Sequence, residues 1–194
     1  VGSAGNVLRV QTQARDGRQV TNAAAIAAAI KGALAGGKGY AGTFATKPLP
    51  AKWTQRAVAP GAEHLAYPAA VGEKWIDVNL SRHTMTAYIG GTVVFGPVAM
   101  VNGAPATPSL VGTYFIQRKY AADRMRGRNA DGTTYDTPDV PWVSYFHGGY
   151  ALHGAPWRST FGYAASHGCI NLPVSTAKWV YDWAPIGTAV ASHF

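Results

Sequence analysis

The chain has 194 residues, of which 47% are hydrophobic and 11% aromatic. This composition excludes a disordered protein and allows one substantial core with a smaller module beside it. The 17 basic and 9 acidic side chains give a net charge of +8, which suits an anionic partner, although a solvated basic surface explains it equally well. The basic residues are scattered and form no nucleic-acid-binding motif, so we expect no nucleic acid among the partners.

The first five residues, V-G-S-A-G, have neither the basic nor the apolar region of a signal peptide. No apolar run approaches the ~18–20 residues that span a bilayer. The single cysteine excludes an intramolecular disulfide. We interpret the chain as a mature or trimmed fragment whose export signal lies outside it.

The N-terminal residues predict a small α+β module over residues 1–47. Alternation over residues 7–13 predicts a strand. An Ala-rich helix is expected from an N-cap at Thr21 or Asn22 to Gly36-Gly37. A second strand is expected over residues 40–46.

A proline-containing stretch, residues 48–72, is predicted to be a linker or an extended strap before a main domain over residues 73–194. Its prolines are Pro48, Pro50, Pro60 and Pro68. Residues 75–80 and 84–89 then alternate apolar and polar side chains, and each run predicts a strand.

The main domain is predicted to be a mostly-β sandwich or barrel-like fold with one late helix. Gly90-Gly91 predicts a hairpin. Further strands are expected over residues 92–95, 98–101, 113–119, 142–146 and 150–153. Ser175 or Thr176 is placed to cap the helix A-K-W-V-Y-D-W. Residues 120–141 are polar and contain Gly and Pro, so we expect a long irregular loop, a feature that is more often functional than accidental.

The only cysteine, Cys169, lies in the run S-H-G-C-I-N, two residues after His167 and sixteen after His153. The thiolate is the attacking species, but a free thiol with a pKa near ~8.5 is mostly protonated at neutral pH. An imidazole can take that proton in the physiological range. Gly168, which lacks a Cβ, allows a sharp turn and lets a substrate carbonyl approach the amides beside the sulfur. The pattern predicts a cysteine nucleophile with its base nearby.

Two other interpretations of the same residues stay open at this point. A lone cysteine is often a small buried hydrophobe, and a lone histidine is often a structural group. Alternatively, His153, His167 and Cys169 could hold zinc, with His147 as a further ligand.

The block from His153-Gly154 through a Gly/aromatic spacer to Ser166-His167-Gly168-Cys169-Ile170-Asn171 resembles the signature of the L,D-transpeptidase (YkuD-type) catalytic domain. Members of that family cross-link bacterial peptidoglycan and are acylated by carbapenems. Where many members have Arg after the Cys-hydrophobe pair, this chain has Asn171.

The resemblance extends over residues 73–193. Residues 75–80 are similar to the family's first strand, and residues 188–191 to its closing strand. Thr107-Pro108 followed by G-T-Y-F at 112–115 is similar to its T-P-x-G-x-F-like segment. Residues 1–47 resemble the C-terminal part of the peptidoglycan-binding module that often precedes such domains, although mere scaffolding is equally consistent with an Ala-rich helix.

The resemblance implies a role for each catalytic position. Cys169 is the nucleophile, His153 is its general base, and the carbonyl of Gly154 orients the imidazole. Backbone N–H groups around Gly168 and Cys169 would stabilise the tetrahedral oxyanion, and His167 would shape that hole and position substrate.

The resemblance also implies substrate-contacting positions. Ser166, Asn171 and Trp157 match such positions beside the nucleophile, although Trp157 could equally be a packing residue. Residues 120–141 correspond to a flap over the active site, in which Met125 and Tyr135 match pocket-lining positions. A loop whose aromatic packs on the domain surface is the alternative.

The implied reaction is thiol acyl transfer without a cofactor or metal. The donor would be a peptidoglycan stem tetrapeptide, cut between its third residue, a diamino acid, and the terminal D-Ala. The side-chain amine of a neighbouring stem would be the acceptor, whereas water as acceptor would make the protein a carboxypeptidase. Anionic wall polymers are a second candidate partner, and we expect an exported protein at the cell wall or periplasm. The sequence predicts no oligomeric state.

Three other classes are weaker. A papain-like or NlpC-like peptidase places Cys before His, the reverse of the order here. A wall-binding protein without activity needs neither His153 nor Cys169. A zinc hydrolase ranks last, because no H-E-x-x-H or H-x-H arrangement occurs.

Overall fold

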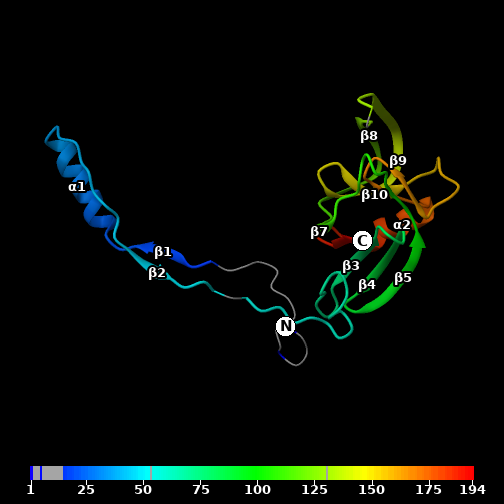
Figure 1. The fold of residues 1–194 in the computed structure, drawn as a ribbon, viewed down its shortest axis with the longest axis horizontal. Coiled ribbons are helices and arrows are strands. Elements are labelled where there is room, and N and C mark those ends of the chain that lie inside the picture. Colours follow the sequence, from blue (N-terminus) through cyan, green and yellow to red (C-terminus); the bar gives the residue numbers. More distant parts are fainter. Residues whose placement is uncertain (2–4, 6–14, 53, 130) are drawn as a thin grey trace. The chain divides into compact units, whose positions relative to one another are not determined.

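The computed structural model describes residues 1, 5, 15–52, 54–129 and 131–194. Within them the chain divides into a small unit, which ends at Arg56, and a larger unit, which consists of Ala57–Phe194 together with Val1 and Gly5. Figure 1 draws the small unit in blue to cyan and the larger one mostly in green to red. No helix among the described residues is both long and apolar enough to cross a membrane.

The small unit is an antiparallel two-stranded ribbon with one helix between its strands. Its elements are β1 (Gly17–Val20), α1 (Ala23–Ala35) and β2 (Thr46–Leu49). The predicted helix is confirmed, with Asn22 at its N-cap and Gly36 at its C-cap. The Asn22 side chain does not cap the helix, because it bonds the backbone of Thr43 and Ala45 instead.

The two strands that the sequence predicted in this unit are not confirmed. The strand expected over residues 40–46 is wrong, since the strand begins only at Thr46, where pairing with Val20 starts. The strand expected over residues 7–13 lies outside the described residues. The similarity of residues 1–47 to a peptidoglycan-binding module stays a prediction.

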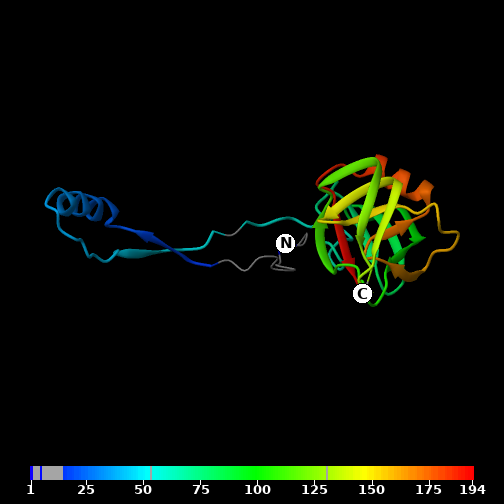
Figure 2. The ribbon, with the colours of Figure 1, turned by 90° about the horizontal axis from the view of Figure 1, so that it is seen from above.

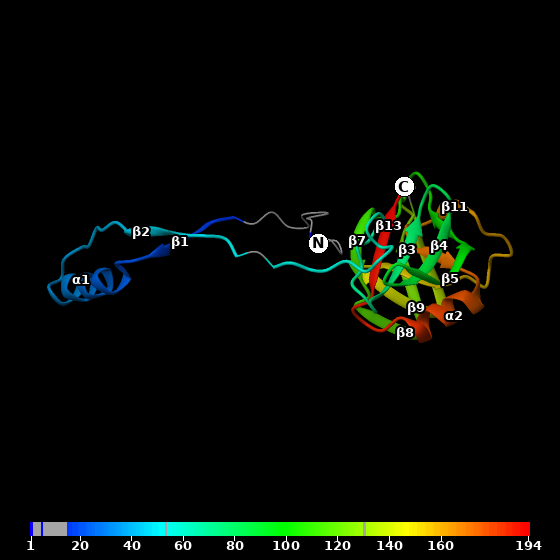
Figure 3. The same ribbon diagram turned by 90° about the horizontal axis from the view of Figure 1, so that it is seen from below.

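The larger unit is built from two β-sheets, which confirms the mostly-β prediction (Figure 2). The five-stranded sheet has the order β5-β4-β3-β13-β7. Its strands are β3 (Lys74–Asn79), β4 (Thr84–Ile89), β5 (Thr92–Ala99), β7 (Gly112–Phe115) and β13 (Ala189–His193). Figure 3 shows β4, β3 and β13 side by side.

The second sheet carries the residues of the predicted site. It has six strands in the order β11-β6-β12-β10-β9-β8. These strands are β6 (Val101–Gly103), β8 (Arg118–Arg128), β9 (Thr134–His147), β10 (Tyr150–Gly154), β11 (Tyr163–Ser166) and β12 (Ile170–Leu172). β10 runs parallel to β12, with His153 opposite Asn171. The register therefore places a histidine and an amide side by side.

The predicted strands of the larger unit are present, but two stretches of the chain are divided into strands differently from the prediction. The two strands expected over residues 92–95 and 98–101 are one strand, β5, followed by β6. Register shifts against β4 lie within β5, one of them at Gly96 and Pro97, which explains the apparent break in the pattern. The strand expected over residues 113–119 divides into β7 and β8, which belong to different sheets.

The core contains buried side chains from both sheets and from α2 (Val174–Trp183). Its largest members include Ile76 and Met85 from the first sheet and Phe146 and Leu152 from the second. Residues 151–154 of β10 are all buried, so the end of the strand at Gly154 is packed against the core.

Helix α2 is present as expected, but the predicted cap is wrong. The helix begins at Val174 after an N-cap at Pro173, whose carbonyl accepts the first helical bond from Ala177 N–H at 2.9 Å. Ser175 and Thr176 are thus inside the first turn, and Thr176 is buried.

The expected irregular loop over residues 120–141 is a β-hairpin made by β8 and β9. Glycine and proline suggested a loop, but Pro138 and Asp139 sit at a register shift between the pairs Asp123↔Val140 and Met125↔Thr137. Such a bulge accommodates a residue that cannot donate to the ladder. We call the described residues of this hairpin between 120 and 141 the flap.

The predicted linker is only partly a linker. From Ala57 onward the chain lies on the larger unit, where Val58, Ala62 and Tyr67 are buried against Trp75. The Trp75 ring is fully buried, and its Nε1–H donates to the carbonyl of Gly90 at 2.9 Å. Residues 57–72, called the strap below, are irregular but are part of the folded domain.

Candidate active site

The turn from Ser166 to Cys169 joins β11 to β12 and is held by hydrogen bonds from its own side chains. The Ser166 hydroxyl donates to the carbonyl of Cys169 at 2.6 Å and accepts from the N–H of Gly168 at 3.1 Å. The amide of Gly168, expected to face an oxyanion, is therefore engaged with Ser166. Gly168 itself has φ +104°, a conformation that favours glycine.

A second set of hydroxyls anchors this turn from outside. Thr107 Oγ1 donates to the carbonyl of Ser166, and Ser109 Oγ donates to the carbonyl of Gly168, each at 2.8 Å. Ser109 also accepts from Gly103 N–H. The segment from Thr107 to Ser109, whose first two residues resembled a family motif, thus positions the backbone beside the cysteine. These two hydroxyls were not among the predicted site residues.

Gly168→Ala is expected to destabilise the protein by about 1–3 kcal/mol and to reduce activity. A Cβ at this position would lie 2.6 Å from the Tyr150 ring and 3.2 Å from the carbonyl of Pro108. Urea unfolding measures the loss. Gly187→Ala is the matched control, because Gly187 has φ +90° but nothing within 4 Å of an added Cβ. Equal losses in both variants would show that backbone conformation alone, and not crowding, makes glycine necessary.

Cys169 lies in an apolar wall with Met125, Val140 and Val143, and only 7% of it is exposed. Its Sγ donates to the carbonyl of Gly149 at 3.5 Å. Burial raises the pKa of Cys169 to about 11, and a hydrogen bond with the backbone of Ala151 opposes this shift. The thiol is therefore the resting form at neutral pH.

His153, at the end of β10, is buried and held at both ring nitrogens. Nδ1 lies 2.9 Å from the carbonyl of Gly154, and Nε2 lies 2.8 Å from Nδ2 of Asn171. A carbonyl only accepts and an amide nitrogen only donates, so Nδ1 carries the proton and Nε2 presents its lone pair. The expected pairing of His153 with Gly154 is present.

The pKa of His153 is lowered to about 4, chiefly because burial disfavours the charged ring. The hydrogen bond to Gly154 raises it, and the nearby charge of Arg158 lowers it. At neutral pH both the thiol and the imidazole are uncharged. Within the described residues no hydrogen bond joins Cys169 to His153, although both line one cavity.

The flap covers the other side of the cavity. The Tyr135 ring stacks on His167 with centroids 4.5 Å apart, and Nε2 of His167 lies 2.6 Å from Oδ1 of Asn129. Gly127 lets the Tyr135 ring cross the hairpin, because a Cβ there would lie 2.6 Å from it. His167 is therefore exposed on the turn and contacts the flap.

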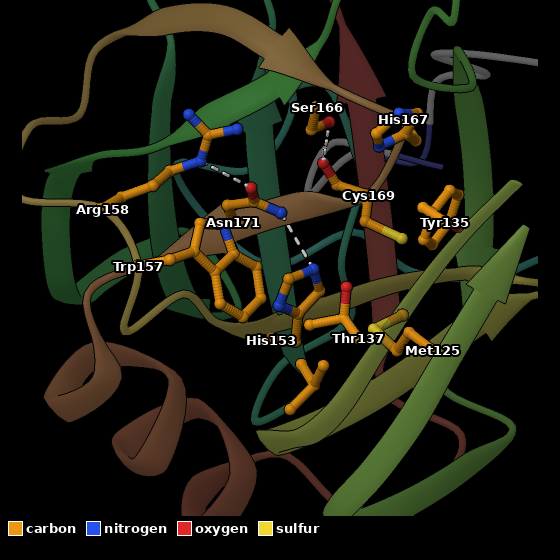
Figure 4. Close-up of a pocket in the computed structure, with 11 residues that line it drawn as sticks. Met125, Tyr135, Thr137, His153, Trp157, Arg158, Ser166, His167, Cys169 and Asn171 are labelled. Carbon is orange, nitrogen blue, oxygen red and sulfur yellow. Dashed lines mark hydrogen bonds between the residues drawn. The ribbon is translucent and has the colours of Figure 1, made fainter. Parts of the chain in front are cut away.

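The cavity has a volume of about 140 Å³ and brings together eight of the ten predicted site residues (Figure 4). They are Met125, Tyr135, His153, Trp157, Ser166, His167, Cys169 and Asn171. Gly154 and Gly168 do not line it; they act on its residues through backbone groups. Figure 4 shows Arg158, Trp157 and Asn171 on one side of Cys169 and Tyr135 on the other.

Three further residues line the cavity and were not predicted: Thr137, Val140 and Arg158. Thr137 and Val140 belong to the flap, so a hairpin interpretation of residues 120–141 would have placed them. Arg158 follows Trp157 and could have drawn attention as a cation beside a predicted contact residue. Among the described residues no cluster of three or more His, Cys, Asp or Glu side chains is arranged to hold a metal ion.

The fold and the site together define a family. The chain matches the L,D-transpeptidase catalytic domain (YkuD) over residues 73–191, and it belongs to that family of acyltransferase-type enzymes. It is 30% identical over 146 residues to L,D-transpeptidase 1 of Mycobacterium tuberculosis, a match that covers 69% of this chain and 56% of that protein. The chain thus spans about half the length of that curated relative.

Solved structures show the same similarity. The catalytic domain of an Enterococcus faecium L,D-transpeptidase, solved by NMR, is 29% identical with a TM-score of 0.57, covering 64% of this chain and 100% of that chain. The L,D-transpeptidase LdtMt1 in complex with imipenem is 25% identical with a TM-score of 0.55, covering 62% of this chain and 58% of that chain.

Proposed function

We propose that this protein is a peptidoglycan L,D-transpeptidase that acts through a thioester on Cys169. One observation carries the proposal: a single cavity holds the only thiol of the chain and a buried histidine whose Nε2 is an unprotonated acceptor, bonded in the resting protein to the Asn171 N–H. The family supports an acyl-transfer reaction. The residues of the cavity supply a nucleophile and a base for it.

The first half-reaction forms the thioester. His153 Nε2 accepts the proton of the Cys169 thiol, and the sulfur attacks the carbonyl of the third residue of the donor stem, a diamino acid. His153 must exchange the Asn171 N–H for the thiol S–H, and both are donors, so one tautomer serves both contacts. The tetrahedral intermediate then collapses, and the imidazolium protonates the nitrogen of the departing D-Ala.

The second half-reaction releases the product. The side-chain amine of a neighbouring stem attacks the thioester carbonyl, gives its proton to His153, and forms a new amide as the thiol leaves. Because the resting thiol and imidazole are neutral, proton transfer must accompany attack on the carbonyl instead of preceding it. The raised pKa of the thiol and the lowered pKa of the imidazole both follow from burial.

The remaining residues of the cavity bind and enclose the substrate. Trp157 is half exposed at the cavity and offers an aromatic face to the stem peptide. Met125 and Tyr135 cover the thiol from the flap and exclude water, which favours an amine acceptor over hydrolysis. A wall substrate places the protein outside the cytoplasm, and the net charge of +8 suits anionic wall polymers as a further partner.

The test is intact-protein mass spectrometry after incubation with purified tetrapeptide muropeptides. We expect a mass increase on the protein equal to the donor without D-Ala, together with cross-linked dimer in solution. The Cys169→Ser variant is the matched control and should show neither product. Accumulation of tripeptide without dimer would show that water is the acceptor and that the protein is a carboxypeptidase instead of a transpeptidase. The absence of every product and of any adduct would contradict acyl transfer itself.

A further inference from the structure

Arg158 makes three hydrogen bonds with one planar guanidinium. Its Nε donates to Oδ1 of Asn171 at 2.9 Å, Nη1 donates to the Tyr163 hydroxyl at 3.0 Å, and Nη2 donates to the carbonyl of Ala165 at 3.1 Å. Figure 4 shows this chain of contacts continuing from Asn171 to His153. The guanidinium is thus fixed at three points, and its own position fixes the amide of Asn171.

The orientation of the Asn171 amide determines which tautomer His153 can adopt. A guanidinium has donors only, so the group of Asn171 that faces it must be Oδ1. The Nδ2 group of Asn171 must then face His153, and an N–H donor there requires a lone pair on Nε2. With Nδ1 bonded to the carbonyl of Gly154, the ring is confined to one neutral tautomer.

We propose that Arg158 is a positioning residue that locks the Asn171 amide and thereby keeps Nε2 of His153 unprotonated, the state from which it can accept the thiol proton once the Asn171 N–H has given way. The significance of this role for catalysis rests on the proposed function. The positioning itself is a property of the resting protein and can be measured without substrate.

Without Arg158 the Asn171 amide is free to rotate by half a turn. Oδ1 would then face Nε2 of His153, and an oxygen acceptor there favours a protonated nitrogen. Both ring nitrogens would have acceptors, the arrangement that suits an imidazolium. Loss of the neighbouring positive charge favours the imidazolium as well. Both effects act in the same direction and raise the pKa of His153.

Few other titratable groups lie close enough to His153 to influence its pKa. Besides Arg158, the described titratable groups of the cavity wall are Tyr135, His167 and Cys169. The elements packed on β10 add Asp136, Asp139, Tyr145 and His147 from β9 and Lys178, Tyr181 and Asp182 from α2. Arg158 alone among these groups shifts the pKa of His153 through its charge.

The test is ¹⁵N NMR of the imidazole nitrogens of His153 in the whole chain over a range of pH. The wild type should show a protonated Nδ1 and an unprotonated Nε2 from about pH 5 upward, given a pKa of about 4. In Arg158→Met we expect the midpoint to rise by about one pH unit or more, with Nε2 partly protonated near pH 6.

Three further variants make the result decisive. Tyr163→Phe removes a different bond of Arg158 and should leave the His153 signals unchanged. Asn171→Asp places a carboxylate acceptor at Nε2 and should force protonation, which shows that the signals report the contact. Arg158→Lys keeps the charge without the planar fork, so it should give an intermediate shift and serves if Arg158→Met does not fold.

Identical tautomer and midpoint in wild type, Arg158→Met and Arg158→Lys would overturn the proposal. The same experiment separates this inference from the proposed function. If His153 responds as expected but Cys169 forms no adduct with donor peptide, the positioning role stands and the transpeptidase proposal fails. If adducts form but His153 does not respond, the opposite holds.

Discussion

Cys169→Ala should abolish both peptide cross-linking and covalent labelling by carbapenems, leaving no detectable rate above background. The chain has one cysteine, so no other thiol can substitute for it. In the wild type we expect a single carbapenem adduct per chain, because the β-lactam carbonyl takes the place of the donor peptide carbonyl. A related L,D-transpeptidase, LdtMt1, has been solved in complex with imipenem. Intact-protein mass spectrometry measures the adduct.

The pH dependence of a simple alkylating reagent adds a check on the resting thiol. With a pKa raised to about 11, roughly 10⁻⁴ of Cys169 is thiolate at pH 7. Alkylation by iodoacetamide should therefore be slow at neutral pH and rise about tenfold per pH unit up to that pKa. Cys169→Ser is the matched control for both reagents. Cross-linking activity that survives in Cys169→Ala would discard the thioester mechanism.

His153→Ala should lower carbapenem acylation near pH 7 by about 10²–10⁴-fold, the usual contribution of a general base. Part of the rate should return as the pH approaches 11, because the thiol then ionises without help. In the wild type the lowered pKa of His153 means that the ring is neutral, and competent as a base, at every pH above about 4. The acidic limb of the wild-type rate should therefore lie near pH 4.

His167→Ala is the matched comparison for that prediction. His167 is exposed, stacks on Tyr135 and is bonded to Asn129, so its loss weakens the contact between the flap and the turn. We expect a lower acylation rate with no recovery at high pH, since no proton acceptor has been lost. Rescue of His167→Ala, and not of His153→Ala, by high pH would reverse the assignment of the base.

The sequence was most informative where a local pattern corresponds to a local structure. The alternation at residues 84–89 matches β4 in full. The short run from His167 to Asn171 contains both the Cys169 thiol and the Asn171 amide, and the two side chains line the same cavity. The His153 contact with the Gly154 carbonyl also follows from adjacency along the chain. Such features depend on residues that are close in sequence, so a pattern of residue types can specify them.

The features that the sequence did not predict depend on pairing between distant segments. The flap looked like a loop because Pro138 interrupts it, and only its pairing with β8 across a register shift makes it a hairpin. The position of the Arg158 guanidinium is fixed by three hydrogen-bond partners, of which Asn171 lies thirteen residues away. Thr107 and Ser109 reach the turn from Ser166 to Cys169 across 59 residues of chain. Single-sequence periodicity contains no information on such contacts.

The strap over Trp75 has a consequence for how this domain is defined in practice. The match to the family starts at residue 73, yet Val58, Ala62 and Tyr67 cover the Trp75 ring from before that point. Covering a large apolar side chain contributes about 1.5–3 kcal/mol, a large share of the stability of a domain. A fragment cut at the family boundary would expose an indole to solvent and tend to aggregate, whereas a fragment that begins at Ala57 keeps it covered. The family match would start an expressed fragment at residue 73, whereas the packing of the strap requires a start at Ala57. An expressed fragment should therefore begin at Ala57.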